Sequence, residues 1–326
     1  MRKKEQKTKK FKLFDLNRDG KGVYEAESRK PNLKFFFILL WRKLVQLLQL
    51  NLMMLFQVLP ILGIVLINIF GAKTSNVANT VYAPLYGISK IVDSPALLSK
   101  LDLVSKQIEA PIVTPIMLVG MAVLALFLFV TFGWQNVGAA YVLRGLFRGE
   151  PVFVFSDFFY AIKKNMKQAL IVGMLDFICC SVLAIDIYFF ITSASSMGID
   201  IMLGIMVAVA IIYFFMRFYI YQLLITFDMK IFKILKNSLI FSVLGIFRNL
   251  VAAVGIILFI GIHILLIIWL LPMGITIPLV LPFVYIISII AFITVYAAYP
   301  VIDKYMIKPY ENEALNETSD EASESQ

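Results

Sequence analysis

The sequence predicts an all-α polytopic membrane helix bundle, with six transmembrane helices and shorter interfacial elbow helices. Of the 326 residues, 60% are hydrophobic, whereas soluble domains average roughly 45–50%. The apolar residues are concentrated in six runs of about 20 residues, the length that a helix needs to cross a hydrocarbon core. These runs do not alternate between apolar and polar residues, which excludes a β-barrel. The predicted spans are residues 50–70, 112–132, 169–191, 198–216, 250–271 and 277–301.

The basic residues lie almost entirely on one side of these spans. Of the 30 Lys and Arg residues, 26 fall in residues 1–49, 133–168, 217–249 and 302–326, and four fall in residues 71–111. Positive charge is retained on the cytoplasmic side of membrane proteins, so both termini are predicted to be cytoplasmic. The formal net charge of +9 follows from this topology, with attraction to anionic lipid headgroups as a by-product. It requires no nucleic-acid partner.

The chain begins with a predicted basic cytoplasmic segment at residues 1–34, followed by the membrane domain at residues 35–310. Residues 15–20 are similar to the start of an EF-hand calcium loop, but Ala26 occupies the position of the bidentate Glu. We therefore predict no metal site there.

Three segments that are both aromatic and basic precede pairs of spans. They lie at residues 35–48, 156–167 and 230–239, and such segments are typical of helices in the membrane interface. Ser156 is predicted to cap the second of them. The recurrence indicates a three-fold repeat of elbow helix and helical hairpin, although cytoplasmic entries to membrane helices share this character in general.

The two remaining segments lie outside the spans. The outer segment at residues 71–111 is predicted to hold a helix that starts after Ser94 and covers the bundle or the outer leaflet. The acidic tail at residues 311–326 is predicted to be disordered.

Asp176 and His263 form the candidate intramembrane polar pair. Asp176 lies in the third span and His263, the only histidine, lies in the fifth. A charged Asp176 must pair, become protonated or face a wet cavity, and a contact with His263 would satisfy both residues. One hypothesis is a proton-coupled or substrate-binding pair; the other is a helix–helix hydrogen bond that fixes packing.

Motifs for catalysis or cofactor binding are not found. A single histidine cannot supply a histidine cluster for zinc or iron. The sequence has no H-E-x-x-H, G-x-S-x-G or P-loop motif. We therefore expect no enzymatic activity, no catalytic residue and no cofactor. The only cysteines, Cys179 and Cys180, are expected to be small packing residues within the third span.

The loop between the second and third spans is the candidate cytoplasmic interaction elbow. It concentrates four charged residues in a short stretch: Arg144, Arg148, Glu150 and Asp157. A positively charged loop followed by a capped helix is the alternative interpretation.

Several motifs in these regions resemble the YesL-like family of bacterial integral membrane proteins, a domain-of-unknown-function family. The resemblance covers residues 35–60 and 134–190 best, and the motifs are Phe35-Phe36-Phe37, Arg42-Lys43, Leu50-Asn51-Leu52, the stretch from Gly138 to Arg144, Arg148-Gly149-Glu150-Pro151, Asp157-Phe158-Phe159 and the stretch from Lys164 to Ala169. It implies a helical protein of the bacterial cell membrane without enzymatic activity and with a role linked to sugar transport. The outer segment at residues 71–111 is longer than is usual in the family.

Two functions are therefore considered. The first is a non-enzymatic membrane protein that is accessory to solute transport, with carbohydrate as the implied solute class. Its partners would be the lipid bilayer and a transporter permease or other membrane protein. The alternative is an autonomous secondary transporter that is proton-linked through Asp176 and His263. The sequence does not indicate the oligomeric state.

The topology can be tested by labelling single cysteines introduced into a background without Cys179 and Cys180. Residues 71–111 are expected to react with an impermeant reagent from outside, and both tails only from inside, because positive charge resists translocation. The reverse pattern would contradict the charge argument.

Overall fold

The computed structural model describes residues 32–71, 73–75, 109–111, 114–193 and 196–310. Four sequence predictions lie outside these residues. They are the basic segment at residues 1–31, the EF-hand-like stretch within it, the outer helix after Ser94 and the acidic tail at residues 311–326.

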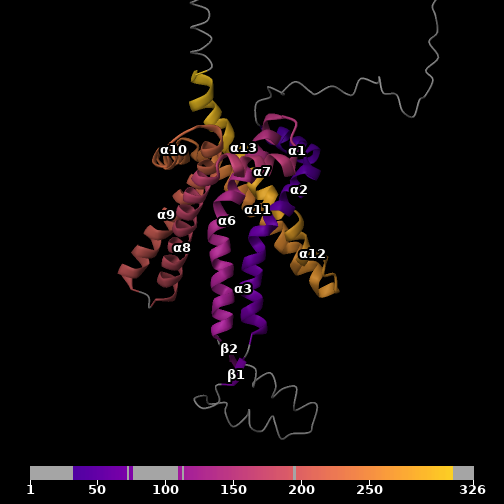
Figure 1. The fold of residues 1–326 in the computed structure, drawn as a ribbon, viewed down its shortest axis with the longest axis vertical. Coiled ribbons are helices and arrows are strands. Elements are labelled where there is room, and N and C mark those ends of the chain that lie inside the picture. Colours follow the sequence, from indigo (N-terminus) through magenta and orange to yellow (C-terminus); the bar gives the residue numbers. More distant parts are fainter. Residues whose placement is uncertain (1–31, 72, 76–108, 112–113, 194–195, 311–326) are drawn as a thin grey trace, which may run out of the picture.

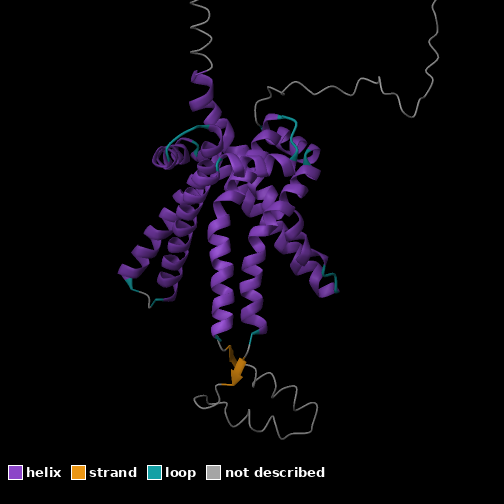
Figure 2. Ribbon diagram, in the orientation of Figure 1, coloured by secondary structure: helices purple, strands orange, loops and turns teal. Residues whose placement is uncertain are grey.

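The described chain is helical almost throughout, as Figure 2 shows. In chain order the α-helices are α1 (Leu33–Arg42), α2 (Leu44–Met54), α3 (Val58–Phe70), α6 (Pro115–Arg148), α7 (Val154–Lys164), α8 (Met166–Thr192), α9 (Met197–Thr226), α10 (Ile231–Leu244), α11 (Ile246–Leu270), α12 (Ile277–Leu281) and α13 (Ile287–Ile302). Short 3-10 segments lie at η1 (Leu55–Gln57) and η3 (Leu271–Met273), and π-helical segments at η4 (Pro282–Ile286) and η5 (Asp303–Ile307). Strand β1 (Lys73–Ser75) pairs antiparallel with β2 (Glu109–Pro111).

Six helical stretches are long and apolar enough to cross a membrane, which confirms the predicted all-α polytopic bundle. They are Leu44–Phe70, Pro115–Arg148, Met166–Thr192, Met197–Thr226, Ile246–Met273 and Ile277–Tyr310. The second and fourth stretches extend well beyond the predicted ends at residues 132 and 216. Hydropathy falls in these extensions because they carry polar residues such as Gln135 and Gln222. Both side chains are buried against protein, so the helix continues there without facing lipid.

Each pair of spans is preceded by a short helix and a single-residue joint. The joints are Lys43 between α1 and α2, Asn165 between α7 and α8, and Gly245 between α10 and α11. Their backbone angles are nearly the same, with φ of −104°, −113° and −92° and ψ of 10°, 19° and 12°. This is the sparsely populated bridge region between helix and strand. The same turn thus separates elbow from span three times, which supports the predicted repeat.

The second elbow helix starts earlier than predicted. Helix α7 begins at Val154, with Phe153 rather than Ser156 as its N-cap residue. The backbone amide of Phe153 donates a hydrogen bond to Oδ2 of Asp157 at 2.8 Å. A carboxylate in the first turn therefore stabilises the helix start, and the prediction of a Ser156 cap is wrong.

Three hairpins diverge from a common region, as Figure 1 shows. We call the end where α1, α7 and α10 lie the elbow end, and the opposite end the tip end. Burial is concentrated toward the elbow end, in residues 47–54 of α2, 133–146 of α6, 215–224 of α9 and 288–302 of α13. We call this region the hub. Toward the tip end, large apolar side chains such as Phe70 and Ile116 are exposed, as expected for helices that face lipid.

Helices α6 and α8 meet in the hub through glycine. A Cβ atom on Gly173 would overlap the backbone of Gly133, and one on Gly133 would overlap the carbonyl of Ala169. Small residues at such a crossing let two backbones approach closely, which is how membrane helices gain packing energy without a hydrophobic driving force. This crossing fixes the part of α8 that carries Asp176.

Candidate functional site

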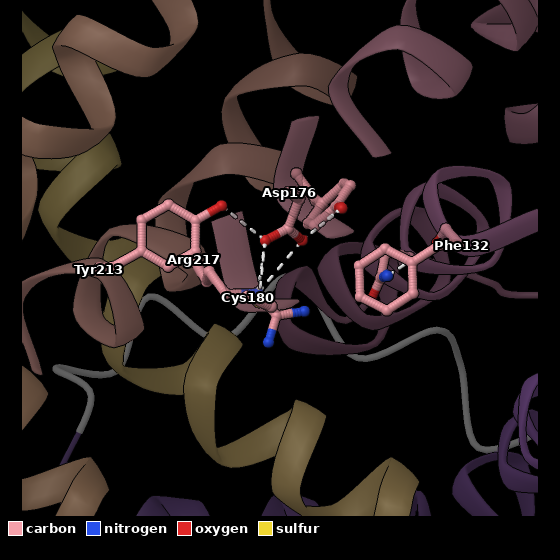
Figure 3. Close-up of polar contacts among 7 residues, drawn as sticks. Phe132, Asp176, Cys180, Tyr213 and Arg217 are labelled. Carbon is pink, nitrogen blue, oxygen red and sulfur yellow. Dashed lines mark hydrogen bonds and ion pairs between the residues drawn. The ribbon is translucent and has the colours of Figure 1, made fainter. Parts of the chain in front are cut away.

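Asp176 accepts hydrogen bonds from one face of helix α9. Its side chain is 1% exposed. Tyr213, Arg217 and Tyr221 are spaced four residues apart, which places them on successive turns of that face. The hydroxyl of Tyr213 donates to Oδ1 at 2.8 Å and the hydroxyl of Tyr221 donates to Oδ2 at 2.6 Å. Nε of Arg217 lies 3.0 Å from Oδ1 and 3.1 Å from Oδ2. Figure 3 shows Tyr213 and Arg217 beside the carboxylate.

Two further side chains complete this cluster. The thiol of Cys180, one turn further along α8, donates to Oδ1 of Asp176 at 3.6 Å. On the other side, the guanidinium carbon of Arg217 lies 5.6 Å from the centre of the Phe132 ring on α6, within cation–π range. We call these six residues the Asp176 cluster: Phe132, Asp176, Cys180, Tyr213, Arg217 and Tyr221.

Every group that contacts the Asp176 side chain donates to it. Tyrosine hydroxyls and the arginine Nε–H act here as donors, so the two carboxylate oxygens serve as acceptors for every contact they make. An ion pair inside a membrane is tolerated when its remaining hydrogen bonds are satisfied. The negative charge of Asp176 is therefore balanced within the protein by α9.

His263 does not contact Asp176, which corrects the predicted pairing. Its Nδ1 lies 2.9 Å from the hydroxyl of Tyr285 and its Nε2 lies 3.0 Å from the carbonyl of Pro278. A carbonyl only accepts, so Nε2 carries the hydrogen in its contact with Pro278. Both ring nitrogens are thus used within the third hairpin.

The hydrogen bond from His263 to Pro278 replaces one that is missing from the helix backbone. In an α-helix the carbonyl of Pro278 would accept from the amide of residue 282, but residue 282 is a proline and has no amide hydrogen. A carbonyl without a donor is costly in a membrane. His263 supplies the missing donor, so its role in this structure is to satisfy the backbone of the last span.

Two other polar side chains act in the same way on the last span. Nδ2 of Asn51 donates to the carbonyl of Phe283 at 2.6 Å, and its Oδ1 accepts from the amide of Ser288 at 2.9 Å, where the helix changes from π to α. Arg248 donates to the carbonyl of Tyr296 at 3.2 Å. Pro300, four residues later, cannot bond to that carbonyl. Three polar side chains thus compensate for irregular backbone.

The residues of the predicted elbow have separate roles. Nη1 of Arg144 lies 3.1 Å from both the carbonyl of Ile225 and Oγ1 of Thr226, so Arg144 binds the C-terminal end of α9, where a helix favours positive charge. Asp157 accepts from the amide of Phe153, as described above. Arg148 and Glu150 form an exposed salt bridge of 3.0 Å. Of the four predicted residues, Arg148 and Glu150 are therefore the pair that faces outward at this turn, which Gly149 closes with a φ of 74°.

Tyr213, Arg217 and Tyr221 were not among the candidate site residues predicted from the sequence. The signal was present as Tyr-x-x-x-Arg-x-x-x-Tyr, three donors on one helix face. Such a face in a membrane helix requires an acceptor, and Asp176 is the acidic residue most deeply placed in a predicted span.

Comparison with known families, with curated proteins and with solved structures finds no match for this chain. Among the described residues, no group of three or more His, Cys, Asp or Glu side chains lies close enough together to hold a metal ion.

The role of His263 can be tested by restoring the missing amide. We expect His263→Leu to lower the free energy of unfolding by about 1–3 kcal/mol, because it leaves the carbonyl of Pro278 without a donor. In a Pro282→Ala background the same substitution is expected to cost less, since the alanine supplies a backbone N–H. Unfolding in mixed micelles measures both values, and an equal cost in the two backgrounds would contradict this role.

The separation of Asp176 from His263 is open to a double-mutant cycle. Asp176→Asn and His263→Gln are expected to be additive within about 0.5 kcal/mol, because the two residues share no partner. The matched cycle of Asp176→Asn with Tyr221→Phe is expected to show a coupling of about 0.5–3 kcal/mol. A large coupling in the first cycle would show that the two residues interact after all.

Proposed function

We propose that this protein is a non-enzymatic membrane protein accessory to a solute-transport system, and that the turn between α6 and α7 binds the transporter permease. In this proposal the elbow end faces the cytoplasm of a bacterium, because it carries most of the basic residues in the part of the chain that the structure describes. The YesL-like resemblance supports carbohydrate as the class of solute.

The observation that carries the proposal is the surface at this turn, which combines charged and aromatic side chains. Arg148 and Glu150 have side chains that are 49% and 46% exposed, and Phe153 and Phe155 are 75% and 52% exposed. We call these four residues the α6–α7 surface. Exposed aromatic and arginine side chains are the residue types that contribute most to protein–protein interfaces.

The scaffold behind this surface is rigid enough to present it. Arg144 ties the end of α6 to the end of α9, and Asp157 fixes the first turn of α7. Surfaces supported in this way lose little conformational entropy on binding, which favours a stable complex.

The alternative of a proton-linked transporter receives less support from the contacts. It requires Asp176 and His263 to exchange a proton, but Asp176 is paired with Arg217 and the ring of His263 is bonded to Pro278 and Tyr285. Accessory function does not require any buried residue to change its protonation state.

The proposal can be tested by purifying tagged protein from its native membrane in mild detergent and identifying co-purifying proteins by mass spectrometry. We expect a solute-uptake permease in near-equal amount. The double variant Arg148→Ala with Phe153→Ser is expected to lower this recovery at least tenfold, because it removes an arginine and an aromatic anchor.

The control is Lys308→Ala, which removes another exposed ion pair, the 3.3 Å contact between Lys308 and Asp303. It is expected to leave recovery of the permease unchanged. The proposal fails if the wild-type protein is recovered without a permease, or if both variants behave alike.

A further inference from the structure

Arg217 uses only one of its three guanidinium nitrogens within the protein. Nε contacts Asp176, and neither terminal nitrogen has a hydrogen-bond partner among the described residues. The side chain is 32% exposed. Figure 3 shows both terminal nitrogens directed away from the Asp176 carboxylate.

The guanidinium is held in place on two sides. Asp176 fixes its Nε edge, and its Cζ lies 5.6 Å from the centre of the Phe132 ring. The terminal nitrogens therefore form a fork of fixed orientation. A planar fork of this kind matches the spacing of two oxygens on a phosphate or carboxylate, and binds them through a pair of parallel hydrogen bonds.

Asp176 does not rely on the terminal nitrogens of Arg217 for its hydrogen bonds. The two tyrosine hydroxyls and the Cys180 thiol all donate to the Asp176 carboxylate, so its negative charge is shared among several donors. The outward edge of Arg217 has no acidic neighbour within the cluster. The terminal nitrogens of Arg217 are therefore the donors of the cluster that have no contact with Asp176.

The depth of Arg217 indicates where such an anion comes from. Asp200 lies in the first turn of α9, at the tip end. Arg217 is about 25 Å further along the helix at 1.5 Å per residue, a little less than the hydrocarbon thickness of about 30 Å. With Asp200 at the edge of the hydrocarbon core at the tip end, Arg217 lies just inside its edge at the elbow end. That position is within reach of a lipid headgroup in the leaflet at the elbow end. Donors left without partners at this depth would be costly.

We propose that Arg217 binds the phosphate of an anionic phospholipid from the leaflet at the elbow end, so that the Asp176 cluster is a lipid-binding site. Asp176 and Phe132 act as positioning residues, and the terminal nitrogens of Arg217 contact the phosphate oxygens. This inference does not depend on the proposed association with a permease.

The test uses the full-length protein purified in detergent, with phosphatidylglycerol as the probe and bound lipid measured by native mass spectrometry. Arg217→Lys keeps a positive charge opposite Asp176 but removes the fork. We expect it to weaken phosphatidylglycerol binding at least tenfold while shifting the melting temperature by only a few degrees. Lys167→Gln removes an exposed basic residue at the elbow end, and is expected to change binding less than threefold.

A second variant covers the case in which Arg217→Lys does not fold. Phe132→Leu leaves the ion pair intact and removes only the aromatic ring next to the guanidinium, so binding is expected to weaken by about three- to tenfold.

Equal retention of phosphatidylglycerol by the wild-type protein and the Arg217→Lys and Phe132→Leu variants would overturn the proposal. Equal binding of phosphatidylcholine would also overturn it, because the anionic headgroup would then not be distinguished. Saturable binding of inorganic phosphate at Arg217 without binding of phosphatidylglycerol would overturn the lipid assignment and make a soluble oxyanion the ligand.

Discussion

Backbone groups within a bilayer have no water to bind, so each needs a hydrogen-bond partner within the protein. The last span of this protein lacks several of the usual backbone partners. Pro282 and Pro300 each withdraw an amide hydrogen from the helix, and a π-helical segment interrupts it. Three side chains from other spans compensate: His263, Arg248 and Asn51. Because these contacts join α2 and α11 to the last span, satisfying the backbone also determines how the hairpins are placed around the hub.

Two further kinds of contact hold the helices of the hub together. The glycine crossing of α6 and α8 brings two backbones together, and the Asp176 cluster joins α8 to α9 through an ion pair. Arg144 adds a link from α6 to the carbonyl end of α9. The glycine crossing, the Asp176 cluster and the Arg144 contact lie toward the elbow end, whereas the contact between His263 and Pro278 lies nearer the tip end. Toward the tip end the hairpins separate, and their apolar side chains are left to the lipid.

The fold was largely predictable from hydropathy because length and apolar composition decide whether a helix crosses a membrane. The ends of α6 and α9 were not, since Gln135 and Gln222 are polar but buried in protein. The sequence also identified Asp176 as a residue that needs a partner. It did not identify the partner, because periodicity shows which residues share a helix face but not which helices are neighbours. His263 illustrates the same limit, since the carbonyl that it binds belongs to Pro278 and lacks an amide donor because residue 282 is a proline.

The hub cannot be completed until α13 has been synthesised. Helix α13 contributes to both buried apolar clusters, and it is bonded to the first described residues, since the hydroxyl of Tyr296 donates to the carbonyl of Asn32 at 2.7 Å. During synthesis the first two hairpins enter the membrane before α13 has been made. Until then, Asn51 on α2 has neither Phe283 nor Ser288 to bond, and one face of α6 is uncovered. The insertion machinery or a lipid must therefore cover these groups until the last span leaves the ribosome.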